Sequence, residues 1–353
     1  MSKPDMLWEK LAAAGLVQGE MPPVEKLPPW YVRTLQGFSG WLAAFFLLGF
    51  MGTLFHGLFD QPWFSLGIGT LLVALAVVLL RHPGKVFADQ FGLAASLAGQ
   101  VLWLVGQKDY WQDSSFWLLW AAVQAVLVWL IALPVHRFLS ATAVVYALSA
   151  AFANLTVFWL VPSLLMLVMA VLWLTETRWL PKAELWSPVA FAVSICVLQM
   201  HAASIISPSV WSEIARQGRQ LQAPSAWILT LNEWLIAGVW LGSTALLLRR
   251  SGIGWSSRHG KLAWGGMVAI ALISQQAQGL TIAWLMMLLG FAQGHRVLLG
   301  LGMMAFWGYL GRYYYLLDAS LLAKSGVLAV SAAVFLAGYA LLHLNSREAQ
   351  DHA

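Results

Sequence analysis

Residues 138–175 read FLSATAVVYALSAAFANLTVFWLVPSLLMLVMAVLWLT and contain no charged side chain. An α-helix crosses the hydrocarbon core of a bilayer with about 20 mainly apolar residues, within a range of about 17–25. This run of 38 uncharged residues is therefore too long for one ordinary membrane span. We divide it at Asn154–Thr156 into two predicted spans, 138–154 and 157–174.

The composition of the whole chain agrees with this stretch. The chain has 353 residues, of which 60% are hydrophobic and 10% are charged, and its mean hydropathy is +0.72. Soluble globular domains are about 45–50% apolar and about 25% charged. The deficit of charge argues against a soluble enzyme, a disordered protein and a nucleic-acid-binding protein. The expected partner of such a chain is the lipid bilayer, and no nucleic-acid partner is expected.

The apolar runs predict about twelve transmembrane helices and an all-α integral membrane fold. The uncharged run 262–294 is divided at Gln275–Gly279, and because both halves are short, a re-entrant hairpin is the alternative there. The predicted spans are 38–59, 63–80, 86–106, 115–133, 138–154, 157–174, 185–206, 226–248, 262–276, 279–294, 297–317 and 321–344.

The distribution of basic residues orients these spans. With the N-terminus in the cytoplasm, 15 of the 20 lysines and arginines fall in cytoplasmic segments. Cytoplasmic loops of membrane proteins carry an excess of Lys and Arg, so this split favours a chain with both termini inside, N-in and C-in. The five basic residues on the predicted outer face are Lys108, Arg216, Arg219, Arg312 and Lys324.

Three regions follow from this topology. Residues 1–37 form a cytoplasmic N-terminal segment, residues 38–344 form the transmembrane domain, and residues 345–353 form a cytoplasmic tail. Leu7, Trp8, Leu11 and Leu16 recur at helical spacing, which predicts a short amphipathic helix in the first region. This helix either lies on the inner membrane surface or docks on a partner.

Residues suited to cofactor or metal chemistry are scarce. Cys196 is the single cysteine, which excludes an intramolecular disulfide. No two of the eight histidines lie three or four positions apart, so no single helix presents two metal ligands on one face and no metal site is expected. Gly300-Leu-Gly302 matches a relaxed dinucleotide fingerprint, but it lies inside an apolar span and is expected to serve helix packing. We therefore predict no cofactor and assign no catalytic residue.

Polar side chains inside the spans are the candidate functional residues, because burial of such groups in a bilayer is costly. Gln124 and Cys196 are the midplane candidates, and Asp89 is the candidate on the cytoplasmic side. The others gather toward the predicted outer face, which suggests an outward-facing vestibule or a partner-docking surface. The alternative for each is a span end that reaches headgroups and water. The outer candidates are His56, His201, Asn232, Glu233, Gln275, Gln276, Arg312, Asp318 and Lys324.

Ser320 and Lys324 lie four residues apart at the start of the last predicted span, so they share one helix face. A Ser–Lys pair can perform nucleophilic chemistry. A hydrated lysine near the outer interface stays protonated, however, so a helix cap at Asp318 or Ser320 is the simpler interpretation.

Two stretches of the chain resemble a known family. Residues 311–325 read GRYYYLLDASLLAKS, and residues 28–44 read PPWYVRTLQGFSGWLAA. They are similar to the C-terminal signature and the start of a bacterial multi-pass inner-membrane family of unknown function, whose genes lie beside those of GDYXXLXY-type membrane proteins. The resemblance implies an inner-membrane location and neighbouring membrane proteins as partners, without an activity or a cofactor. The positions that would inherit a function of the signature are Tyr313, Tyr314, Leu316, Ser320, Leu321, Lys324 and Ser325.

Three functions are compatible with the sequence. The leading hypothesis is a membrane-embedded component that acts with a partner at its periplasmic face, because polar residues gather there and the midplane has few. The second is a small-solute transporter or channel, which pairs of short abutting spans would suit. A continuous cavity reaching Gln124 or Cys196 would support that second function, and a solid core would argue against it. The third is an intramembrane enzyme.

Overall fold

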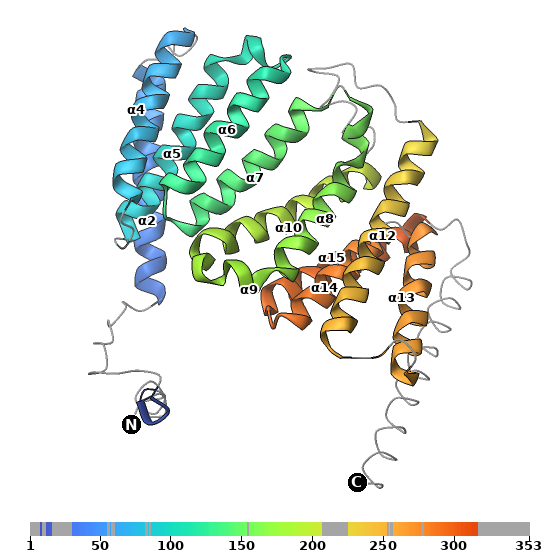
Figure 1. Ribbon diagram of the computed structural model, residues 1–353. Coiled ribbons are helices and arrows are strands. Elements are labelled where there is room, and N and C mark those ends of the chain that lie inside the picture. The colour runs from blue at the N-terminus through green and yellow to red at the C-terminus, as the bar shows by residue number, and fades with distance from the viewer. Residues whose placement is uncertain are drawn as a thin grey trace. The chain divides into compact units, whose positions relative to one another are not determined.

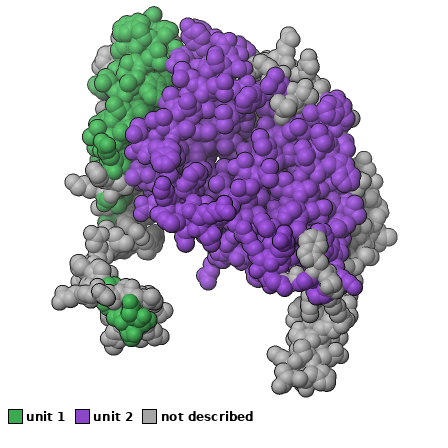
Figure 2. Space-filling view, in the orientation of Figure 1, with its two compact units in different colours: residues 1–106 green, residues 107–353 purple. Residues whose placement is uncertain are grey.

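The computed structural model describes residues 8, 12–15, 30–54, 57, 61–81, 84, 86–153, 155–206, 225–252, 254, 257–276 and 279–316. Every regular element within these ranges is a helix (Figure 1), which confirms the all-α prediction for them. The chain divides into two compact units, residues 1–106 and residues 107–353 (Figure 2).

Glycines allow close helix packing in the first unit. A Cβ atom added to Gly99 would lie 2.6 Å from the carbonyl oxygen of Gly69, so these two backbones approach too closely for a side chain. Such contacts are typical of helices that pack in membranes. An indole N–H adds a bond between helices, because Trp41 Nε1 donates to Gln90 Oε1 at 2.8 Å. The described helices of this unit are α2 (Trp30–Leu54), α4 (Pro62–Leu80) and α5 (Val86–Gly106).

The second unit is a larger helical bundle. Its short 3₁₀ helices are η1 (Lys108–Tyr110), η2 (Thr156–Leu160) and η3 (Leu180–Lys182). Its described α-helices are α6 (Ser114–Leu130), α7 (Pro134–Ala151), α8 (Val161–Leu174), α9 (Glu176–Trp179), α10 (Ala183–Ile206), α12 (Ala226–Arg250), α13 (Arg258–Gln276), α14 (Leu280–Ala292) and α15 (Arg296–Leu316).

Both predicted divisions of the long apolar runs are confirmed as helix breaks. Helix α7 ends at Ala151, and η2 leads into α8, whose first turn contains Pro162. Proline is favoured in a first turn because an N–H at that position has no helical acceptor. Helix α13 ends at Gln276, and α14 begins after Gly279, whose φ of +91° is a conformation that glycine adopts readily.

Helices α8 and α12 are parallel, and α10 runs against them. Near the start of both parallel helices, the Ser163 N–H donates to Asn232 Oδ1 at 3.2 Å. At their other ends, Arg250 Nη1 donates to the carbonyl oxygen of Leu174 at 2.6 Å. Helix α10 has the opposite direction, because His201 near its end meets Glu233 near the start of α12.

Helices α13, α14 and α15 continue this alternation. Gln275, at the end of α13, reaches the backbone of Glu233 near the start of α12, so α13 opposes α12. Helices α14 and α15 cross closely, since a Cβ on Gly302 would lie 2.7 Å from the Met287 nitrogen. The Gln293–Trp173 contact joins the ends of α14 and α8, and the Tyr309–Leu198 contact joins late turns of α15 and α10. Helices α8, α10, α12, α13, α14 and α15 therefore alternate in direction, and the number of membrane spans stays a prediction.

Arg137 joins three helix ends. Its Nε donates to the carbonyl oxygens of Val128 and Ile131 at the end of α6, at 3.2 and 2.9 Å. Its Nη1 donates to the Glu184 carbonyl oxygen at 2.9 Å. Pro188 lies inside α10 and has no N–H, so the carbonyl of Glu184, four residues earlier, lacks its usual helical donor. Arg137 is one of the 15 basic residues that the predicted topology assigns to cytoplasmic segments. In the structure its side chain is buried and bonds to backbone carbonyl oxygens.

Three helices of the described residues are long and apolar enough to cross a membrane: Pro62–Leu80, Glu176–Ala202 and Trp227–Arg250. Shorter apolar helices accompany them, and large apolar side chains such as Phe45 and Phe291 are exposed. Extensive apolar surface marks contact with lipid or with other proteins. The chain therefore has the features of a membrane protein.

Part of the prediction falls outside the described residues. Trp8, Ala12 and Ala13 are helical, in agreement with the predicted amphipathic helix, whose other positions are not among those described. The last predicted span, 321–344, and the tail, 345–353, also lie outside them.

Candidate functional site

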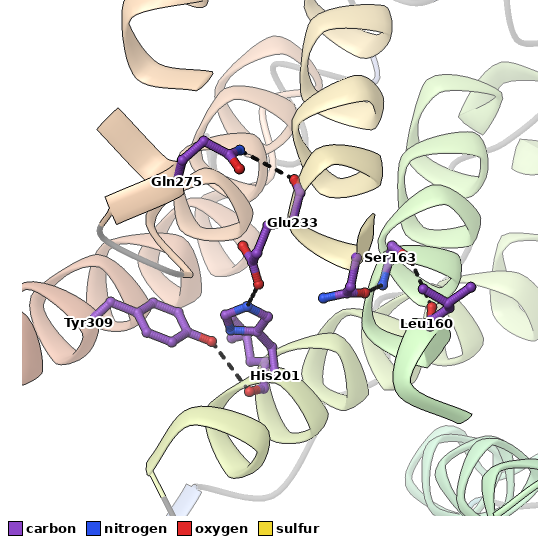
Figure 3. A network of polar contacts seen from close by, with 8 residues as sticks. Leu160, Ser163, His201, Glu233, Gln275 and Tyr309 are labelled. Atoms are coloured by element: carbon purple, nitrogen blue, oxygen red, sulfur yellow. Dashed lines mark hydrogen bonds and ion pairs between the residues drawn. The ribbon is translucent and has the colours of Figure 1, made fainter. Parts of the chain in front are cut away.

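His201 and Glu233 meet inside the second unit (Figure 3). His201 Nε2 lies 3.4 Å from Glu233 Oε1, and the side chains are 0% and 11% exposed. Both residues belong to the predicted outer cluster, and neither is a span end that reaches water. The burial of this pair argues against the alternative interpretation, in which each side chain reaches headgroups and water from a span end. We call His201, Glu233, Gln275 and Tyr309 the Glu233 site.

Tyr309 completes this site and was missed in the sequence. Its ring stands nearly perpendicular to the His201 imidazole, with 5.6 Å between centroids, and its hydroxyl donates to the Leu198 carbonyl oxygen at 3.4 Å. The ring packs directly on Gly279, where an added Cβ would overlap it. A tyrosine within an apolar span was a weak signal, because aromatic residues are common throughout this chain.

Asn232 and Gln275 support the backbone around the pair. Asn232 Oδ1 accepts the Ser163 N–H, which lies in the first turn of α8 and has no helical acceptor. Gln275 Nε2 lies 3.5 Å from the Glu233 carbonyl oxygen and 3.4 Å from that of Ala271. These side chains position helices α8, α12 and α13 rather than touching the Glu233 carboxylate.

The His201 and Glu233 side chains are polar partners inside an apolar bundle. Among the described residues, His201 is the one whose side chain contacts the Glu233 carboxylate. A buried polar group without a partner is costly, and each side chain of this pair is the partner of the other. At 3.4 Å the contact is longer than an ordinary hydrogen bond of about 2.9 Å, so the pair is loosely joined.

A second His–carboxylate pair lies at the other end of the same helices. His295 Nε2 is 2.7 Å from Glu176 Oε1, with the imidazole 4.8 Å from the Trp173 ring, centroid to centroid. Gln293 Nε2 donates to the Trp173 carbonyl oxygen at 2.9 Å, beside the Arg250 contact to Leu174. We call Trp173, Glu176, Arg250, Gln293 and His295 the Glu176 site.

The Glu176 site closes the end of α8. Three consecutive carbonyl oxygens there, those of Leu172, Trp173 and Leu174, accept from side chains of three other elements. Terminal helix carbonyls have no donor within their own helix, so these bonds satisfy groups that would otherwise be unpaired. Neither His295 nor Glu176 is among the candidates that the sequence indicates. Their 119-residue separation left no local signal.

The other candidates are not brought into either site. Asp89, in the first unit, accepts the Gly84 N–H at 3.0 Å before α5. Gln124 and Cys196 are fully buried, and neither side chain contacts solvent. Arg312 and Tyr314 are half-buried on the last turns of α15. The candidates whose side chains lie outside the described residues are His56, Gln276, Tyr313, Asp318, Ser320 and Lys324.

Within the described residues, no group of three or more His, Cys, Asp or Glu side chains could hold a metal ion. The described polar sites therefore consist of two His–carboxylate pairs, with N–O distances of 3.4 Å in the Glu233 site and 2.7 Å in the Glu176 site. Between them the core contains Trp173, Met166, Met169 and Cys196, all fully buried.

The comparison with protein families gives one match, which spans residues 29–344. Comparisons with curated proteins and with solved structures gave no significant match. The matched region covers residues 311–325 and all but the first residue of 28–44, the two stretches that carried the resemblance in the sequence, and it brings no assigned activity. The chain belongs to the family described as "Domain of unknown function (DUF4401)".

Proposed function

We propose that this chain is a multi-pass protein of the bacterial inner membrane, with both termini in the cytoplasm and the Glu233 site at the periplasmic end. The alternating helix directions support this orientation, as does the concentration of Lys and Arg in segments at the opposite end. The Glu176 site then lies at the cytoplasmic end.

Its function in this proposal is that of a membrane-embedded component that acts with a partner at the periplasmic face. The packed centre of the second unit carries the proposal. Cys196 and Ser194, on the helix that also carries His201, have no exposed surface, so this face of α10 is packed against the rest of the bundle. Among the described residues of this bundle, the two His–carboxylate pairs lie at its ends, where a partner rather than a permeating solute can affect them.

A photo-crosslinking residue at Ser225 tests the partner. Ser225 is exposed, precedes α12 and lies at the Glu233 end, whereas the matched control, Lys182, is exposed at the Glu176 end. In intact cells we expect a protein adduct from position 225 and none from position 182. Glu233→Gln, which keeps the side-chain shape, should lower the adduct yield without lowering the amount of protein in the membrane. Adducts formed only with lipid or with this chain would contradict the proposal.

A small-solute transporter is the second candidate, and the presence of ionisable pairs at both ends of one bundle favours it. Intramembrane His and carboxylate groups often mark ion and substrate pathways. Cys196, the single cysteine, distinguishes the two functions. A component with a permanently packed centre should leave this thiol unlabelled by a membrane-impermeant maleimide until the protein is denatured. Rapid labelling in native membranes would favour transport.

A further inference from the structure

The end of the second unit that holds the Glu176 site carries an excess of exposed cations. Contacts from Arg250 to Leu174, from Gln293 to Trp173 and from His295 to Glu176 bring the ends of α8, α12 and α14 together. Basic side chains flank each of these ends, and Lys182 follows shortly after α9. The exposed cations are Arg178, Lys182, Arg249, Lys261 and Arg296.

These cations have no carboxylate partner among the described residues. The ion pairs found there are His201–Glu233 and His295–Glu176, so neither pair involves a lysine or an arginine. Glu176 is occupied by His295 at 2.7 Å, which leaves Glu184 as the other acidic side chain described at this end. The surface is therefore strongly positive.

Large exposed apolar side chains lie next to the same cations. Leu180 precedes Lys182, Val297 follows Arg296, and Leu262 follows Lys261, and each of the three apolar side chains is more than half exposed. Cations directly beside lipid-facing apolar residues occur where the hydrocarbon region gives way to headgroups. A water-soluble acidic partner would leave those apolar side chains in water, whereas a lipid covers both.

We infer that this surface binds the headgroups of anionic phospholipids, with Arg178, Arg249 and Arg296 as the phosphate-binding side chains. The guanidinium group presents paired donors that match phosphate oxygens, and basic surfaces at the cytoplasmic side of helices attract anionic lipids. The inference rests on the membrane placement proposed above, and it is independent of a periplasmic partner.

The test uses the full-length protein in lipid nanodiscs. We compare wild type, the triple variant R178Q/R249Q/R296Q, and a control of equal charge change, K108Q/R216Q/R219Q, at the predicted outer face. The lipid is phosphatidylcholine with increasing phosphatidylglycerol, and the readouts are retained phosphatidylglycerol and the thermal unfolding midpoint. In pure phosphatidylcholine the three proteins should unfold at the same temperature, which shows that the triple variant folds.

We expect phosphatidylglycerol to raise the midpoint of wild type and control, and the triple variant to bind this lipid at least roughly tenfold more weakly. Equal retention by all three proteins, or an equal loss in the control, would overturn the inference. Inorganic phosphate in place of phosphatidylglycerol should not stabilise wild type, and equal stabilisation would show a phosphate site instead of a lipid surface. Crosslinking at Ser225 is measured separately, so either proposal can fail alone.

Discussion

At the scale of single residues, His201 and Glu233 share one physical constraint. Both side chains are buried, and their contact spans 3.4 Å. Removing one member of a buried pair leaves an uncompensated group, whereas removing both together leaves none. The two residues should therefore respond to mutation as a unit, and an apolar replacement of one should cost more than a polar replacement that keeps a hydrogen-bonding group beside the other.

His201→Leu should destabilise the protein by about 3–5 kcal/mol, because it leaves the buried Glu233 carboxyl group without its polar partner. Glu233→Gln should cost about 1 kcal/mol or less, because a neutral amide can remain beside the imidazole. In His201→Leu/Glu233→Met, apolar groups replace both partners, and most of the loss should be recovered. The unfolding free energy in detergent micelles measures all three. Equal losses for the two single variants would show that the charge of Glu233 is irrelevant.

At the scale of elements, the interior proline of α10 depends on Arg137. The guanidinium supplies a donor to Glu184, whose carbonyl oxygen cannot receive an N–H from position 188. Arg137→Met should cost about 2–4 kcal/mol, because it leaves buried carbonyl oxygens without donors. Pro188→Ala restores a helical N–H for Glu184. The double variant should therefore lose about 1 kcal/mol less than the sum of the two single changes. If the free energy of unfolding lost in the double variant equals the sum of the two single losses, Arg137 does not compensate for the proline.

The junction of α13 and α14 depends on Gly279. Its φ of +91° disfavours any side chain, and an added Cβ would overlap the Tyr309 ring. Gly279→Ala should cost about 2–4 kcal/mol, from backbone strain and displacement of the ring. Gly238, in α12, has no atom within 4 Å of an added Cβ, so Gly238→Ala should leave stability equal or slightly higher. Similar unfolding midpoints for both alanine variants would refute this role.

At the scale of the whole molecule, the two ends of the second unit differ in chemistry. One end holds the loosely joined Glu233 site, and the other holds the Glu176 site and the exposed cations. The proposed orientation assigns these ends to opposite sides of the membrane. In a Cys196→Ser background, a cysteine at Ser225 should react with an impermeant maleimide from the periplasm, and one at Lys182 only after membrane disruption. The reverse order would invert the topology, and equal labelling would refute opposite faces.

Much of the helix pattern could be predicted because it depends on local sequence. The breaks after Ala151 and Gln276 follow from run length and from turn residues such as Gly279, and α5 occupies the predicted range 86–106. The start of α2 was not predicted. The predicted span begins at residue 38, whereas α2 begins at Trp30, because the first turns of the helix are polar and precede the apolar run. Apolar content detects the buried middle of a helix better than its ends.

The sequence by itself determined an all-α fold, long apolar helices and the break between α7 and α8, because these properties depend on neighbouring residues. Only the tertiary structure decided which polar groups meet. His201 and Glu233 lie 32 positions apart, and Glu176 and His295 lie 119 apart, so their contacts depend on which helix faces pack together. Packing joined His201 and Glu233, two separate candidates in the sequence, into one buried pair, and it made Arg137 a structural donor. Helical periodicity specifies a buried face, but the partner of that face is set by the shape of the whole bundle.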